Sequence, residues 1–159
     1  MRSVMNALVV YHSEFGNTRQ VAEAIADVFS RSGSARTVSA EQLDAADLQG
    51  VDLVVMGTPT HKMNLPQAVR AVFEQLPRRS LGGVPVAAFD TSYEMSVLLA
   101  RFTAAKRVDR KLRKLGGKRL VPPETFHVHH HHEGPLLNGE LERAKTWAEA
   151  ILVKLDGRA

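Results

Sequence analysis

The stretch from residue 7 to residue 26 changes abruptly from one secondary-structure pattern to another. Residues 7–11 form an apolar run of strand length. From residue 17 onward the apolar residues recur at helical spacing instead, and they are Val21, Ala22, Ile25, Val28 and Phe29. Only the short segment Ser13–Thr18, which contains Gly16, separates the two patterns. The sequence therefore predicts a buried strand, a tight loop and a helix that begins at once.

The loop has the chemistry of an anion site. A helix N-terminus presents unpaired backbone N–H groups and the positive end of the helix dipole, so it suits a phosphate. Ser13 and Thr18 add hydroxyl donors, Asn17 adds an amide donor, and Gly16 allows the backbone to approach a ligand closely. Neither G-x-G-x-x-G nor G-x-x-x-x-G-K-[ST] is present. A capped turn that binds nothing is the alternative interpretation.

Strands and helices alternate along the rest of the chain. Apolar strands are predicted at 35–38, 51–57, 84–89 and within 120–129. Helices are predicted at 66–76 and 140–155, and a basic helix that follows the loop 90–96 is predicted to end near residue 115. Such alternation indicates an α/β fold, with a parallel sheet covered by helices on both faces. We expect a single domain over residues 1–159 and a three-layer α/β/α sandwich. Right-handed crossovers leave few strand orders, and 2-1-3-4-5 is one of them.

Ligands of such sheets bind beyond the carboxyl ends of the strands, at the point where the strand order reverses. In the order 2-1-3-4-5 that point lies between the first and third strands. Three loops should therefore converge there, namely 13–18, 58–65 and 90–96.

The first of these loops resembles the phosphate loop of the flavodoxin family, [ST]-x-T-G-x-T, which wraps the phosphate of flavin mononucleotide (FMN). Ser13, Gly16 and Thr18 match the pattern. Phe15 departs from it and removes one hydroxyl donor. Glu14 is a like charge beside the expected phosphate, and we expect it to point to solvent.

The other two loops resemble the same family. The segment 57–61 reads G-T-P-T-H and is similar to the G-[TS]-P-T-[HRY] loop along the isoalloxazine ring. The segment 89–93 reads F-D-T-S-Y and is similar to the G-D-x-x-Y loop on the other side of the ring, with Phe89 in place of the glycine. The resemblance implies a five-stranded parallel sheet of order 2-1-3-4-5 and these cofactor-binding residues: Ser13, Glu14, Phe15, Gly16, Asn17 and Thr18 for the phosphate, Thr58, Pro59, Thr60 and His61 on one side of the ring, and Asp90, Thr91, Ser92 and Tyr93 on the other.

The resemblance implies one noncovalently bound FMN per chain and electron transfer to a redox partner protein. The flavin carries such chemistry, so we expect no catalytic side chain. Two alternatives stay open. The protein could be an FMN-dependent quinone or small-molecule reductase, or a protein of this fold that has lost its flavin and serves in protein interactions.

The charge of the chain bears on its partners. The net charge is +4 and the sequence pI is 9.7, which favours acidic partners. Much of the excess lies in residues 106–119, where an apolar stripe at helical spacing indicates a solvated helix face or a docking face for an acidic protein. The segment lacks interleaved aromatic residues, so we expect no nucleic-acid partner. We also expect no membrane span, a cytoplasmic location and, without cysteine, no thiolate chemistry.

A run of histidines, 129–132, follows His127 near the end of the last predicted strand. Alternate imidazoles of a strand share one face, and two of them could bind Zn²⁺, Ni²⁺ or Cu²⁺. Glu133 is the only adjacent carboxylate, and no second motif completes a tetrahedral site. We therefore assign no metal site and favour a polar, solvent-facing strand end.

Overall fold

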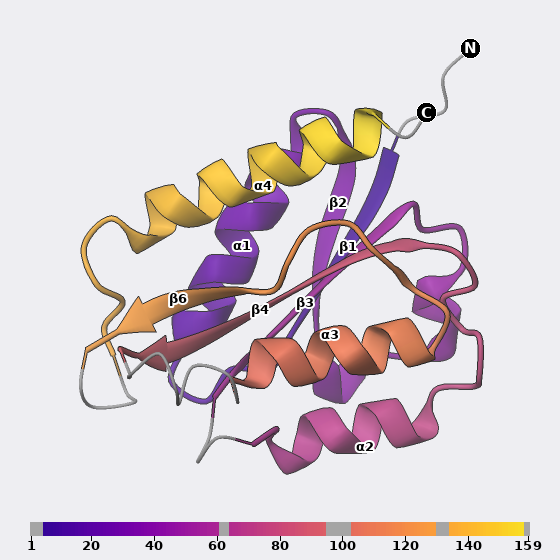
Figure 1. Cartoon of the computed structure of the whole chain (residues 1–159), viewed down its shortest axis with the longest axis horizontal. Coiled ribbons are helices and arrows are strands. Elements are labelled where there is room, and N and C mark those ends of the chain that lie inside the picture. The colour runs from indigo at the N-terminus through magenta and orange to yellow at the C-terminus, as the bar shows by residue number, and fades with distance from the viewer. Residues whose placement is uncertain (1–4, 61–63, 95–102, 130–133, 158–159) are drawn as a thin grey trace.

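The computed structural model describes residues 5–60, 64–94, 103–129 and 134–157. Strands and helices alternate along these residues (Figure 1). The elements are β1 (Met5–Tyr11), α1 (Asn17–Ser30), β2 (Gly33–Ser39), the 3-10 helices η1 (Ala40–Gln42) and η2 (Ala45–Leu48), β3 (Leu53–Pro59), α2 (Gln67–Gln75), β4 (Pro85–Tyr93), α3 (Ala104–Lys114), β5 (Lys118–Arg119), β6 (Glu124–Val128) and α4 (Glu140–Asp156).

The paired strands confirm the order 2-1-3-4-5. Strand β1 pairs with β2 on one side and with β3 on the other, and β4 pairs with β3. All of these pairings are parallel. The order reverses beside β1, so the switch point lies between β1 and β3.

The fifth position of the sheet is divided, which corrects the prediction of five strands. Both β5 and β6 pair in parallel with β4, at Pro85 opposite Lys118 and at Phe89 opposite Glu124. The segment between them contains Pro122 and Pro123, which have no N–H group to donate to a ladder. The predicted strand within 120–129 is therefore β6, and β5 precedes it.

Helices cover both faces of the sheet, as the apolar strands predict. Helices α1 and α4 lie on one face, and α2 and α3 lie on the other (Figure 1). Successive residues of β1 alternate between the two layers: Ala7 and Val9 pack on the α1 side, whereas Leu8 and Val10 pack on the α2 side. All four side chains are buried, which explains why the strand reads as an unbroken apolar run.

Three aromatic rings form the centre of the α1/α4 layer. Phe89, Phe126 and Trp147 meet edge to face, with centroids 5.8–6.0 Å apart. Phe89 also covers Gly57 on the neighbouring strand, where an added Cβ would lie 2.0 Å from the ring. The phenylalanine that replaces the family's glycine therefore requires a glycine at the end of β3.

The connection from β2 to β3 contains the two 3-10 helices η1 and η2, which place Ala40 and Leu48 in the core. Helix α3 begins at Ala104, where the carboxylate of Asp90 accepts the backbone N–H of Ala105.

Candidate functional site

The ends of β1, β3 and β4 lie together at the carboxyl edge of the sheet. The backbone N–H of His12 donates to the carbonyl of Gly57 at 3.0 Å, and that of Thr60 donates to the carbonyl of Thr91 at 2.9 Å. The hydroxyls of Thr18 and Thr91 lie 2.8 Å apart. A small hollow lies here, lined by Ser13, Glu14, Phe15, Asn17, Thr18, Pro59 and Thr91. The structure thus brings together seven of the fourteen predicted site residues.

Ser13 shapes the first loop. Its hydroxyl oxygen accepts the N–H of Gly16 at 3.0 Å and that of Arg19 at 3.4 Å. Gly16 has a left-handed φ of 92°, and a Cβ placed there would meet no described atom within 4 Å. The first turn of α1 holds no acidic residue. The loop therefore exposes the positive end of the helix dipole, as the sequence predicts for an anion site.

The hollow itself is small. Its volume is about 10 Å³, room for roughly one water molecule. Gly134 crosses the loop so closely that a Cβ there would lie 2.5 Å from the amide nitrogen of Asn17. The donors fit a phosphate by their chemistry, and the loop must widen to admit one. Sequence patterns gave no signal for this contact, because 117 positions separate the two residues.

Glu14 is held by a neighbouring histidine. Its carboxylate lies 3.8 Å from Nε2 of His12, whose Nδ1 contacts the carboxylate of Glu41. The side chain of Glu14 is 34% exposed. The imidazole of His12 therefore lies between the carboxylates of Glu14 and Glu41.

Asp90 and Thr60 lie on the α3 side of the sheet. The carboxylate of Asp90 is fully buried and accepts the hydroxyl of Thr60 at 2.5 Å and the N–H of Ala105 at 3.1 Å. Burial raises the pKa of Asp90, although these hydrogen bonds oppose the rise. Its side chain therefore holds the start of α3 and does not line the hollow.

Three buried polar atoms of this region, one of them in Asp90 itself, have no hydrogen-bond partner among the described residues. They are Oδ1 of Asp90, Oγ of Ser92 and Nδ1 of His127. Ser92 stands opposite His127 in the ladder of β4 and β6. Unsatisfied buried groups commonly mark an ordered water.

The remaining predicted residues divide by exposure. Thr58 is buried and donates to the carbonyl of Pro59 at 3.3 Å. Pro59 and Tyr93 are half-buried. Tyr93 borders a second hollow of about 160 Å³, with Glu94, Val128, His129 and Leu137. His61 lies outside the described residues.

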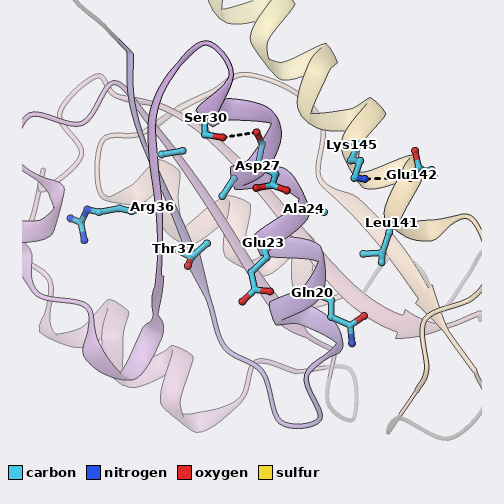
Figure 2. A pocket seen from close by; sticks show the side chains of 12 residues that line it. Gln20, Glu23, Ala24, Asp27, Ser30, Arg36, Thr37, Leu141, Glu142 and Lys145 are labelled. Carbon is cyan, nitrogen blue, oxygen red and sulfur yellow. Dashed lines mark hydrogen bonds and ion pairs between the residues drawn. The ribbon is translucent and has the colours of Figure 1, made fainter.

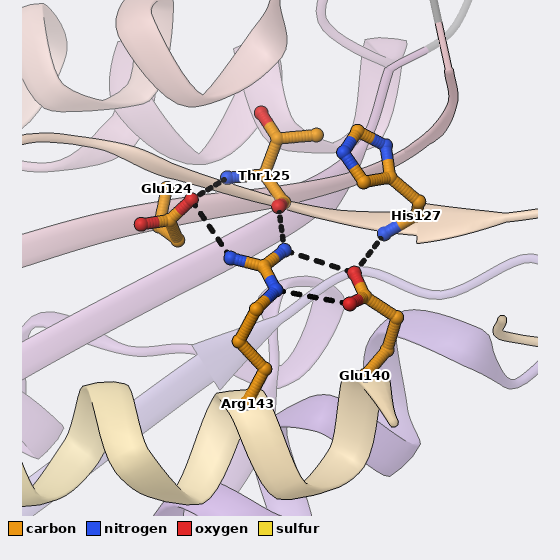
Figure 3. Close-up of polar contacts among 5 residues, drawn as sticks. All are labelled: Glu124, Thr125, His127, Glu140 and Arg143. Atoms are coloured by element: carbon orange, nitrogen blue, oxygen red, sulfur yellow. Dashed lines mark hydrogen bonds and ion pairs between the residues drawn. The ribbon is translucent and has the colours of Figure 1, made fainter. Parts of the chain in front are cut away.

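An ion-pair network between α4 and β6 positions the end of the sheet (Figure 3). Arg143 donates to both carboxylate oxygens of Glu140 at 2.9 Å, to Glu124 at 3.0 Å and to the carbonyl of Thr125. Glu140 accepts the backbone N–H of His127 at 2.5 Å. Burial alone would raise the pKa of Glu140, but the bonds from Arg143 and His127 outweigh it and hold that pKa below its ordinary value. The sequence did not predict this network, because its members in β6 and α4 lie far apart along the chain.

A much larger hollow lies elsewhere, along α1, β2 and the start of α4 (Figure 2). Its volume is about 860 Å³, and the charged residues that line it are Glu23, Asp27, Glu142, Arg36 and Lys145. Both cations are paired, Arg36 with Asp47 and Lys145 with Glu142, whereas Asp27 has no ion pair to a described cation. Three carboxylates against two paired cations leave the lining net negative, so this hollow suits a phosphorylated cofactor poorly.

Among the described histidines, His127 lies in β6 and His129 donates its backbone N–H to the carbonyl of Pro135. Residues 130–132 lie outside the described residues. Within the part of the chain that the structure covers, no group of three histidine or acidic side chains could hold a metal.

No helix within the described ranges is both long and apolar enough to cross a membrane.

Comparison with known proteins gives one family match. Residues 9–147 match the family model described as flavodoxin. A protein from Clostridium saccharobutylicum described as a flavodoxin is 26% identical over 157 residues, which cover 95% of this chain and 98% of that protein.

Solved structures share the fold. Oxidised flavodoxin 2 from Bacillus cereus superposes with a TM-score of 0.78 at 20% identity, covering 94% of this chain and 99% of that one. A Streptococcus pneumoniae flavodoxin superposes with a TM-score of 0.75 at 19% identity and the same coverage. These likenesses confirm the predicted three-layer fold and strand order.

Proposed function

This chain belongs to the flavodoxin family of FMN-binding electron-transfer proteins, and from that premise we propose that the three loops at the carboxyl edge of its sheet hold one FMN. The single observation that carries the proposal is the Thr18–Thr91 contact, which joins the first helical turn to the end of β4 across the small hollow. When bound, FMN supplies the electron-transfer chemistry. The residues of the chain bind and orient it.

The phosphate would lie over the N-terminus of α1. There the backbone N–H groups of the Ser13–Thr18 loop and the helix dipole favour a dianion. Ser13 accepts two backbone N–H bonds and keeps its own proton to donate. Thr18 shares one proton with Thr91, so the second hydroxyl proton remains available. Phe15 adds no donor, and with 52% of its surface exposed it does not fill the hollow.

The ring would lie between Pro59 and Tyr93. Both are half-buried where β3 and β4 end, and a tyrosine ring presents a π-face on which a flat heterocycle stacks. Thr58, Thr60, Asp90 and Ser92 are buried, so their backbone groups and not their side chains would face the ring. His61 completes this proposed set.

Family membership implies a redox partner protein, and the net charge of +4 favours one with an acidic docking face. A cytoplasmic location is part of the proposal and rests on the family.

A flavin titration tests the proposal. Adding FMN to the apoprotein should quench flavin fluorescence with a stoichiometry of one and give oxidised-flavin absorbance bands that shift on binding. Riboflavin, which has no phosphate, should bind at least tenfold more weakly, because the phosphate loop would have nothing to hold. Equal affinities would exclude the Ser13–Thr18 loop as the phosphate site, and no quenching at tens of micromolar would exclude the cofactor.

A further inference from the structure

Helix α3 carries a stripe of cations on the side that faces α2. Arg107, Arg110, Lys111 and Lys114 are spaced i, i+3, i+4 and i+7, so they share one face and span about 10 Å of helix. Together with Arg70 of α2, and with Asn64 and Leu65 before that helix, they line a groove of about 200 Å³.

The cations of this groove are not neutralised within the described part of the chain. Two other basic residues of the same region are: Arg113 lies 3.1 Å and Arg119 lies 3.9 Å from the carboxylate of Asp109, which is 3% exposed. No ion pair joins any of the five groove cations to a described carboxylate. The basic segment that the sequence shows as continuous thus separates into a paired face and an unpaired one.

The groove begins at Asn64 and Leu65, the last residues of the loop that is proposed to lie along the flavin ring. Leu65 is buried in the α2/α3 core, so it holds one end of the groove in place. The chain from Pro59, which borders the small hollow, to Leu65 is six residues long, at most about 20 Å when fully extended. A protein bound in the groove would therefore contact the same loop that is proposed to lie along the ring.

We propose that the groove between α2 and α3 is the docking surface for an acidic segment of the redox partner. This inference rests on the proposed function and adds the place and chemistry of docking. Three of the five cations are arginines, whose planar guanidinium groups pair with carboxylates through two hydrogen bonds. The side chains are largely exposed, so each pair stabilises the complex little, and their summed field mainly accelerates association. Weak, fast and salt-sensitive docking suits an electron carrier that must release each partner.

A nucleic acid is the less suitable occupant. Proteins that bind single strands stack bases on aromatic side chains, and the groove has none among its described residues. Its one apolar contributor, Leu65, is buried.

The test is a binding experiment that does not depend on electron transfer. An acidic plant-type ferredoxin, in its oxidised form, is titrated into the ¹⁵N-labelled, FMN-reconstituted protein at about 20 mM NaCl, and amide signals are followed by NMR. We expect the largest changes at 65–70 and 107–114. Raising the salt to about 200 mM should weaken binding at least tenfold, because exposed charge pairs are screened.

Two variants with the same net charge distinguish the charges of the groove from the overall charge of the protein. R110E/K111E reverses two groove charges, and R31E/K154E reverses two exposed charges away from the groove. Both lower the net charge by four. We expect the groove variant to weaken ferredoxin binding at least tenfold and the control variant no more than about twofold. Equal weakening would show that only net charge matters and would overturn the proposal.

Two further outcomes separate this inference from the proposed function. If FMN binds and the α3 signals do not move, the docking surface is wrong and the flavin assignment stands. If the apoprotein binds no FMN but still shows the α3 shifts with ferredoxin, the groove stands and the flavin assignment fails. A twelve-nucleotide DNA strand that binds the groove more tightly than ferredoxin would overturn the choice of an acidic protein.

Discussion

The hydroxyl of Thr18, in the first turn of α1, lies 2.8 Å from the hydroxyl of Thr91 near the end of β4. Both residues are almost fully buried, and they stand 73 positions apart along the chain. The bond therefore ties two of the three loops of the candidate site to one another. It also leaves one hydroxyl proton free for a ligand.

Removing either hydroxyl should cost stability, and removing both should cost less than the sum. Thr18→Val leaves the hydroxyl of Thr91 buried without this partner, at about 1–2 kcal/mol of unfolding free energy. Thr91→Val has the same effect on Thr18, whereas the double variant leaves no orphaned group. Urea denaturation of the three variants measures the coupling. Costs that simply add would show that the bond contributes nothing.

The same variants separate binding from folding. Thr18→Val should weaken FMN binding by about 1 kcal/mol, because a donor to the phosphate is lost. Thr91→Val should change the affinity less, since its hydroxyl acts through Thr18. Isothermal titration with FMN measures the affinity of both variants. A larger loss of affinity in Thr91→Val than in Thr18→Val would show that Thr91, and not Thr18, contacts the phosphate.

Asp90 should make stability depend on pH in an unusual direction. Its pKa is raised by burial in the folded state, so its contribution is fully present below the unfolded pKa of about 3.9 and is lost as pH rises through the folded pKa. In the Asp90→Asn variant the amide would not titrate, and its oxygen could still accept the bonds from Thr60 and Ala105. The stability of Asp90→Asn relative to the unchanged protein should therefore increase with pH.

Urea midpoints of both proteins between about pH 4 and pH 8 check this slope. Other titrating groups are common to the two proteins, so the difference isolates Asp90. A difference that stays flat with pH would contradict the raised pKa. The FMN affinity of Asp90→Asn should remain unchanged, because the carboxylate lies on the α3 side of the sheet.

Gly57→Ala should destabilise the fold by roughly 2–3 kcal/mol, since the new methyl group would overlap the ring of Phe89. Phe89→Leu in the same chain should recover part of that loss by removing the ring. Thermal unfolding followed by circular dichroism provides the comparison. A fully stable Gly57→Ala variant would show that the ring can move aside at no cost.

Arg143→Gln should lower the unfolding free energy by about 2 kcal/mol at pH 7, allowing for the partial exposure of the guanidinium. Glu140 has a lowered folded pKa, so the stability it contributes is present above its unfolded pKa of about 4.3 and is lost as pH falls through the folded pKa. The difference in unfolding free energy between the unchanged protein and Arg143→Gln should therefore become smaller at acidic pH.

Arg143→Lys is the control for this network. It keeps the charge and loses the paired hydrogen bonds, so its cost should lie between zero and that of Arg143→Gln. Chemical denaturation at about pH 3.5 and pH 7 measures both variants. An effect of Arg143→Gln that is equal at the two pH values would mean that Glu140 is not its main partner.

Local pattern was sufficient for the architecture of this protein. The apolar run at β1 and the helical spacing that follows it are properties of a few neighbouring residues, and the unbroken run predicts burial on both faces of the sheet. The division of the last strand was not predicted, although Pro122 and Pro123 stood in the sequence as its cause. The fourteen site residues remain a prediction that the flavin titration tests.

What only the tertiary structure decided is which polar groups meet. The sequence places Asp90, Thr91 and Ser92 in one loop, but the alternation of a strand sends Thr91 to Thr18 and Asp90 to the start of α3. The sequence likewise shows one basic segment, and buried Asp109 neutralises part of it while the α2 side has no ion pair to a described carboxylate. Secondary structure depends on neighbours along the chain, whereas charge pairing and hydrogen bonding depend on distances that exist only after the chain has folded.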